Sequence, residues 1–232
     1  MKEKELPFRD RTLLSRYHPS AWLLATQLLL LLLYAIFDGN HSQHVLISVL
    51  GTIILVLIVW VIYRSPVVNW VAWVLAIPAL VLSVMTVVIE NSTLLVISSF
   101  LEAGLYFYAA AGLIAYMLGD YRVTTDEIFA AGATYTLLAW GFAYAYLVVD
   151  ILVPGSFVGP LNSDRPATFV ELLFVSFTNL SATGLSDIVP ASAPARVVIM
   201  LEQFAGVGYI AVVISRLVGL MGRRKSDEPA NR

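Results

Sequence analysis

The chain has 232 residues, of which 59% are hydrophobic and only 13% are charged, and its formal net charge is −2. Soluble domains carry about 25% charged residues, and the mean hydropathy here is +0.82, so a soluble enzyme and a disordered chain are excluded. The low net charge leaves no basic surface for a nucleic acid. Without cysteine there is no disulfide, thiolate metal site or cysteine nucleophile. We therefore predict an integral membrane protein that is not an enzyme and has no cofactor.

Six apolar segments are candidates for transmembrane helices, which need about 20 mostly apolar residues. Each ends at polar or turn-forming residues, and the fifth opens with hydroxyl and acidic side chains that suit the positive end of a helix. The predicted fold is all-α, with a cytoplasmic segment at 1–20, four helices within 21–118, a second domain at 123–221 and a tail at 222–232. The predicted spans are 21–37, 44–63, 67–89, 93–118, 127–153 and 193–221.

The basic residues indicate an orientation. With six spans, all but two of the 14 basic residues fall on one side of the membrane, the exceptions being Arg165 and Arg196. Because the cytoplasmic side retains Lys and Arg, both termini are predicted to be cytoplasmic, in a bacterial-type plasma (inner) membrane. A cleaved signal peptide is the alternative for the first span, but no small-residue cleavage site follows its leucine run.

The connection between the fifth and sixth spans contains an apolar run at 167–180. As a helix this run would be roughly 20 Å long, short of the roughly 30 Å hydrocarbon core, which is typical of a re-entrant segment. The small and hydroxylated residues 181–190 follow it. Unpaired backbone groups cannot face lipid, so this stretch is expected within protein or along a water-filled path, where carbonyls can be presented to an ion. An extracellular loop with a surface helix is the alternative.

The order of outer helix, short helix, polar stretch and inner helix resembles the pore-loop potassium channels. The likeness covers 123–220 and is carried by residues 154–157, 177–190, 195–196, 201–202 and 209–220. It implies a homotetramer, because one chain supplies one wall of carbonyls and dehydrating an ion takes a ring of four loops. It also implies a filter for K⁺, with Na⁺ as the other candidate and no further metal, formed by Ser181, Ala182, Thr183, Gly184, Leu185, Ser186 and Asp187.

This stretch departs from the family's Thr-Val-Gly-Tyr-Gly-Asp pattern, of which only Gly184 and Asp187 are retained. Ala182 offers no hydroxyl to the innermost ion site, and Leu185 cannot make the hydrogen bonds of the family's tyrosine. Ser186 replaces a glycine where a left-handed backbone is expected, which is costly for a residue with a Cβ. A potassium filter, a non-selective cation pore and a non-conducting modulatory or scaffold protein therefore remain open.

The last span also holds candidates for gating. Gly206 and Gly208 permit either a hinge or close helix packing. Glu202, like Glu102 in the fourth span, is an acid inside an apolar segment, which is expected to face the protein interior or water. Each acid either senses protons or forms structural hydrogen bonds. Because the span at 93–118 has no Lys or Arg, voltage sensing through it is disfavoured.

Overall fold

The computed structural model of the chain describes residues 19–37, 69–89, 91–119, 125–159 and 166–226. The predicted span at 44–63 lies outside these residues. Two short strands, β1 (Phe157–Val158) and β2 (Val189–Pro190), pair antiparallel and draw together the two ends of the connection between the helices Thr125–Leu152 and Ala193–Ser226. The helices of the described residues are α1 (Pro19–Phe37), α3 (Asn69–Val88), α4 (Ser92–Leu118), α5 (Thr125–Leu152), α6 (Phe169–Leu180) and α7 (Ala193–Ser226).

Three of the described helices are long and apolar enough to cross a membrane, over Ser92–Leu118, Asp126–Leu152 and Ala193–Arg216. They confirm the helices expected at 93–118, 127–153 and 193–221. The apolar parts of α1 and α3 are shorter, Ser20–Tyr34 and Trp70–Thr86. The chain is therefore a helical membrane protein, and six crossings, cytoplasmic termini and the division into two domains remain predictions.

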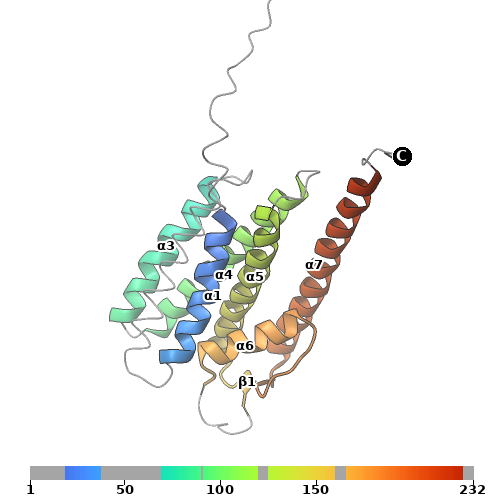
Figure 1. Cartoon of the computed structure of the whole chain (residues 1–232). Coiled ribbons are helices and arrows are strands. Elements are labelled where there is room, and N and C mark those ends of the chain that lie inside the picture. The colour runs from blue at the N-terminus through green and yellow to red at the C-terminus, as the bar shows by residue number, and fades with distance from the viewer. Residues whose placement is uncertain (1–18, 38–68, 90, 120–124, 160–165, 227–232) are drawn as a thin grey trace, which may run out of the picture.

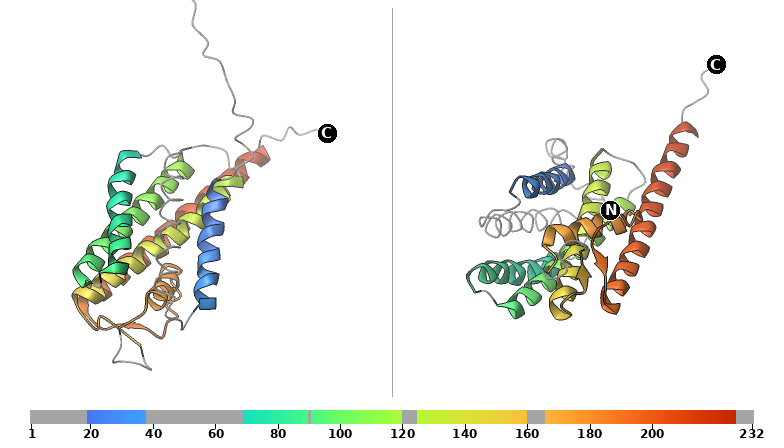
Figure 2. Two further views of the ribbon diagram at one scale, coloured as in Figure 1. Left: turned by 90° about the vertical axis from the view of Figure 1, so that its left-hand side faces the viewer. Right: turned by 90° about the horizontal axis from the view of Figure 1, so that it is seen from below.

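Helix α5 is the centre of the arrangement. It contacts α1 and α4 as well as α6 and α7, while α3 packs on α4. As a result α3 and α7 lie at opposite sides of the molecule (Figure 1). The view from below shows the same separation, with α5 and α6 between α3 and α7 (Figure 2).

Local capping groups explain where several of these helices begin. Asn91 precedes α4, and its side-chain oxygen accepts a hydrogen bond from the backbone N–H of Thr93 at 2.8 Å. The first turn of α5 carries Asp126 and Glu127, as the sequence predicted, where acids favour the positive end of the helix dipole. Asp126 also accepts a hydrogen bond from Ser20 of α1 at 3.1 Å, so this turn joins α1 to α5.

An aromatic cluster connects the N-terminal helices to α6. Tyr106 of α4 stacks on Trp140 and Tyr144 of α5, with ring centroids 6.0 and 5.6 Å apart. Phe169, the first residue of α6, lies 5.7 Å from Trp140 and 4.6 Å from Tyr144 between ring centroids. Because aromatic pairs add about 0.5–1.5 kcal/mol each beyond their buried area, this cluster fixes the start of α6 against α5.

Candidate functional site

The candidate site is the loop 181–187, which follows α6. Helix α6 begins at a capping box, in which the Thr168 hydroxyl accepts from the Glu171 N–H at 3.3 Å and the Glu171 carboxylate accepts from the Thr168 N–H at 2.7 Å. Its 12 residues give a length of about 18 Å. The short helix expected at 167–180 is therefore confirmed, and its re-entry into the membrane stays a prediction.

The first backbone N–H groups of the loop turn back onto the end of α6. Those of Thr183 and Gly184 both donate to the carbonyl oxygen of Thr178, at 2.9 and 3.0 Å. The N–H of Ala182 donates to the carbonyl oxygen of Asn179 at 2.9 Å. Three successive amides are thus directed at the last turn of the helix.

The direction of these amides decides the direction of the carbonyls. A trans peptide holds each C=O opposite the following N–H, and the described residues contain no cis peptide. The carbonyl oxygens of Ser181, Ala182 and Thr183 therefore point away from α6. No donor from the described part of the chain reaches these three oxygens. The loop presents them as a row on its free side.

The loop achieves this turn with two left-handed residues, Ala182 at φ +58° and Gly184 at φ +62°. The expectation of a left-handed backbone at Ser186 is wrong, because among the described residues Ala182 is the only non-glycine with positive φ. The reason is that the chain reverses at 182–184, where the amides converge on α6. The hydroxyl oxygen of Ser186 instead accepts a hydrogen bond from the backbone N–H of Ile188 at 3.1 Å.

The hydroxyl groups of the loop are also directed inward. Ser181 and Thr183 each donate their hydroxyl to the Thr178 carbonyl at 3.0 Å. The Thr183 hydroxyl is thus engaged on the α6 side, opposite the free carbonyls. The side chain of Leu185 is 75% exposed, and Asp187 is exposed as well. Both project from the outer part of the loop rather than into the subunit.

Side chains from α5 and α7 hold the end of α6. The Gln203 amide of α7 donates to the Asn179 side chain at 2.9 Å, and the Tyr135 hydroxyl of α5 donates to the Phe177 carbonyl at 3.3 Å. Sequence reasoning did not select these residues. The available signal was the presence of amide side chains within apolar segments at 179 and 203, but nothing in the sequence pairs them.

The three gating candidates have different surroundings. Gly206 lies against the end of α6, where an added Cβ would collide with the backbone carbonyl of Leu180. Nothing lies within 4 Å of the corresponding position at Gly208. Glu202 is completely buried, hydrogen-bonded to Tyr146 of α5 and Ser176 of α6. Glu102 is buried too, within hydrogen-bonding reach of Tyr144 and Ser83, so both acids face the interior as expected.

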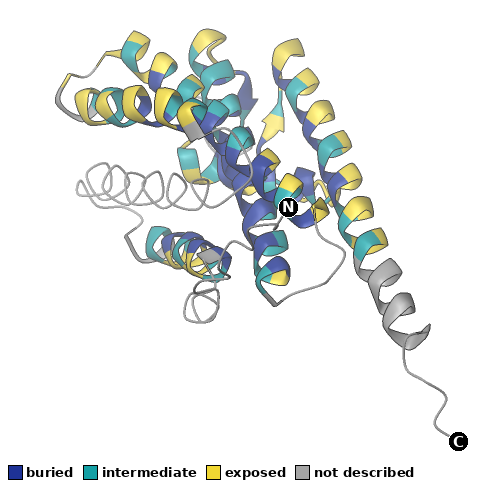
Figure 3. Cartoon of the chain, turned by 90° about the horizontal axis from the view of Figure 1, so that it is seen from above, coloured by how far each residue is buried: buried dark blue, intermediate teal, exposed yellow. Residues whose placement is uncertain are grey.

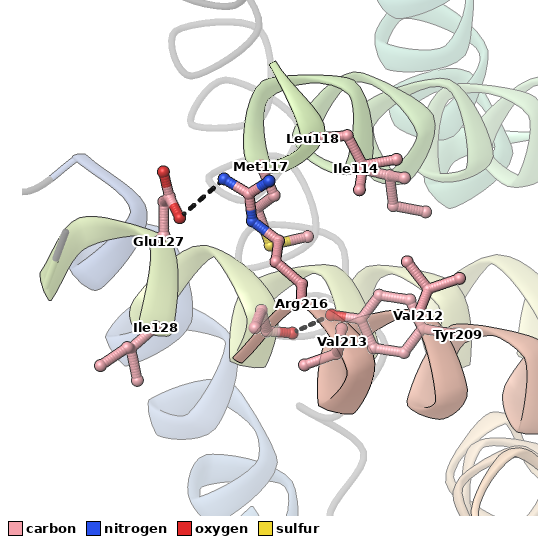
Figure 4. Close-up of a pocket in the computed structure, with 10 residues that line it drawn as sticks. Ile114, Met117, Leu118, Glu127, Ile128, Tyr209, Val212, Val213 and Arg216 are labelled. Atoms are coloured by element: carbon pink, nitrogen blue, oxygen red, sulfur yellow. Dashed lines mark hydrogen bonds and ion pairs between the residues drawn. The ribbon is translucent and has the colours of Figure 1, made fainter. Parts of the chain in front are cut away.

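A second set of contacts, in the second half of α7, ties this helix to α5. Arg216 forms an ion pair with Glu127 at 3.2 Å, and the Tyr209 hydroxyl donates to the Ala131 carbonyl at 2.6 Å. Both contacts border an apolar pocket between α4, α5 and α7 (Figure 4). Arg216 and Glu127 are the two charged residues among those that line this pocket, and most of the others are apolar. Sequence reasoning had not paired these residues.

The fold and the site define a class of protein, namely a helical membrane protein in which two spanning helices, α5 and α7, flank a short helix and a polar loop. A family model described as "Ion channel" matches residues 103–223, just over half of the chain. The chain belongs to this family of pore-loop ion channels with two transmembrane helices per pore unit. The match begins inside α4, earlier than the resemblance at 123–220. No curated protein and no solved structure matches the chain.

Proposed function

We propose that the chain is the subunit of a homotetrameric cation channel that conducts K⁺ through a filter formed by the loop 181–187. The observation that carries this proposal is the row of three carbonyl oxygens, from Ser181 to Thr183, that point away from α6 and receive no donor from the described residues. Carbonyl oxygens replace the hydration shell of a monovalent cation when they surround it as a ring. One loop supplies one side of such a ring, so four copies complete it.

The two faces of α7 support assembly around an axis. One face is buried on α5 and α6 through Ala195, Ile199, Glu202, Gly206 and Tyr209. The opposite face leaves large apolar residues uncovered, including Phe204 at 82% exposure and the exposed Leu201 and Val207, each three positions away. Figure 3 shows exposed residues along α7. In the tetramer this free face of α7 lines the pore and contacts neighbouring subunits.

Charge at the two ends of the loop favours a cation. Helix α6 ends where the loop begins, so the negative end of its dipole adjoins the carbonyl row. At the other end, Asp187 is exposed and attracts cations to the outer mouth. The distribution of Lys and Arg orients the channel with both termini in the cytoplasm, in the plasma membrane.

A non-selective cation channel is the second candidate, and one observation favours it. The Ser181 and Thr183 hydroxyls both donate to the Thr178 carbonyl at 3.0 Å, and Ala182 has no hydroxyl. In a tetramer, this row of carbonyls would therefore offer the ion backbone oxygens alone, without a further ring of side-chain hydroxyl oxygens. Fewer fixed oxygen ligands give less discrimination between K⁺ and Na⁺.

Flux into liposomes that contain the purified full-length protein tests the proposal. We expect K⁺ flux above Na⁺ flux, and its loss in Gly184→Ala, which places a Cβ at φ +62° within the loop. Gly155→Ala is the matched control, because Gly155 has φ +79° and, like Gly184, nothing within 4 Å of an added Cβ, but lies outside the loop. Equal flux of both ions would favour the non-selective channel. No flux at any pH or voltage would overturn conduction in favour of a modulatory or scaffold role.

A further inference from the structure

Glu202 joins the three helices of the pore unit at one buried point. Its side chain extends from α7. One carboxyl oxygen accepts a hydrogen bond from the Tyr146 hydroxyl of α5, and the other contacts the Ser176 hydroxyl of α6. The residue is 0% exposed, and Ser176 is equally buried. Any change in the charge of this carboxyl therefore acts on the packing of α6 between α5 and α7.

A count of hydrogens shows which charge state fits this arrangement. The Ser176 oxygen also lies 2.8 Å from the carbonyl oxygen of Ala139. A hydroxyl has one hydrogen, and a carbonyl has none to give. Ser176 can therefore bond fully to both neighbours only if it donates to Ala139 and accepts a hydrogen from Glu202. A protonated Glu202 carboxyl satisfies both contacts of Ser176, whereas a carboxylate would compete with the Ala139 carbonyl for the single hydroxyl hydrogen.

Among the residues that the structure describes, no cation faces Glu202 to balance a negative charge. The ionisable groups facing it are Tyr146, in contact, and Tyr135, close enough to feel its charge, both from α5. The side of α6 packed here presents the Ser176 hydroxyl, and on α7 the nearest cation in sequence, Arg196, is exposed and bonded to the Pro190 carbonyl. A buried carboxylate without a cationic partner is costly, so ionisation opposes this packing.

We propose that Glu202 is a positioning residue whose proton holds α6, and through it the loop 181–187, in the arrangement that conducts. The inference rests on the proposed channel function. When Glu202 is ionised, the single hydroxyl hydrogen of Ser176 cannot bond fully to both the Glu202 carboxylate and the Ala139 carbonyl. The negative charge of Glu202 also remains buried. The carboxyl proton leaves to bulk water as the pH rises, so conduction is present at low pH and lost toward high pH.

The pH dependence of flux in Glu202→Gln provides the test. A glutamine amide donates to Ser176 and its carbonyl accepts from Tyr146, so it reproduces the bonds of the protonated acid without a titration. In the wild type, flux should fall about tenfold per pH unit above the transition, as for any activity that requires one bound proton. Glu202→Gln should conduct across that range. Glu102→Gln, a change at the other buried acid, should keep the wild-type profile.

Infrared difference spectra separate this inference from channel function itself. The spectrum of the wild type minus that of Glu202→Gln should show the C=O stretching band of a protonated carboxylic acid. The corresponding difference spectrum for Glu102→Gln identifies any band from the second acid. The Glu202 band should disappear over the same pH range as the flux. Absence of that band, or an unchanged pH profile in Glu202→Gln, would overturn the proposal. If no variant conducts, channel function fails, while the band still shows whether Glu202 holds the proton.

Discussion

At the scale of single residues, the loop 181–187 depends on two left-handed positions. The reversal at Ala182 and Gly184 directs three amides to the end of α6 and three carbonyls to the free side. The left-handed region costs a residue with a Cβ roughly 1–2 kcal/mol. Gly184 avoids that cost, and Ala182 bears it. The strained alanine therefore lies within the carbonyl row itself.

Replacing the strained alanine should stabilise the protein. We expect Ala182→Gly to raise the free energy of unfolding by about 1 kcal/mol or less, because relief of strain exceeds the entropy that glycine adds to the unfolded chain. Denaturant unfolding in detergent measures this change. Ala191→Gly is the control, since Ala191 is exposed and not left-handed, and it should be neutral or destabilising. A loss of stability at Ala182→Gly equal to that of the control would contradict a strained alanine.

At the scale of elements, the apolar runs and capping residues were sufficient to predict α4, α5, α6 and α7. The short α6 could be predicted because its apolar run ends at small polar residues before it reaches the length of a span. The contacts that seat α6 could not be predicted. Glu202 meets Ser176 and Tyr146 across 26 and 56 residues of sequence, and apolar patterning carries no information about which polar residues of two helices will meet.

The loop shows the same limit. The sequence was sufficient to predict that a polar stretch follows the short helix and presents backbone carbonyls. It was not sufficient to predict which residues are left-handed. The resemblance directed attention to Ser186, whereas the hydrogen bonds to Thr178 fix the reversal at Ala182 and Gly184. Such bonds depend on the relative placement of helix and loop, which a motif aligned on Asp187 alone does not determine.

The two glycines of α7 should differ in their tolerance of a side chain. In Gly206→Ala the added Cβ must displace the backbone of Leu180, so we expect destabilisation of about 1–3 kcal/mol, as for overpacked interiors. Gly208→Ala meets open space and should gain roughly 0.5–1 kcal/mol from helix propensity. Thermal unfolding of both variants measures the contrast. Equal stability of the two variants would contradict the close contact at Gly206. If Gly208→Ala kept its stability but lost flux, Gly208 would be a hinge.

Across the whole subunit, α7 is attached to the other helices at two regions along its length. Glu202 and Gln203 bind α5 and α6 near the loop, and Tyr209 and Arg216 bind α5 beside the apolar pocket. Movement of α7 away from α5 would break the Arg216–Glu127 pair. This pair therefore stabilises the arrangement of α7 that the structure shows.

The ion pair should be strongly coupled. Its side chains are 16% and 7% exposed, so Glu127→Gln leaves a largely buried arginine charge and should cost about 1–3 kcal/mol, below the 3–5 kcal/mol of fully buried pairs. The double variant Glu127→Gln with Arg216→Gln removes both charges and should recover part of that loss. Unfolding free energies of the wild type, both single variants and the double variant form the thermodynamic cycle. Additive losses would show that the pair contributes no coupling.

In the proposed channel, a permeant ion binds the carbonyl oxygens of Ser181, Ala182 and Thr183. Solid-state NMR of the full-length protein in bilayers, labelled with ¹³C at backbone carbonyls, measures this directly through a titration with K⁺ against Na⁺ at constant ionic strength. We expect the carbonyl resonances of these three residues to shift with K⁺, while those of Ser156 and Phe157, outside the loop, stay in place. Carbonyl resonances at 181–183 that do not respond to either ion would contradict ion binding by this loop.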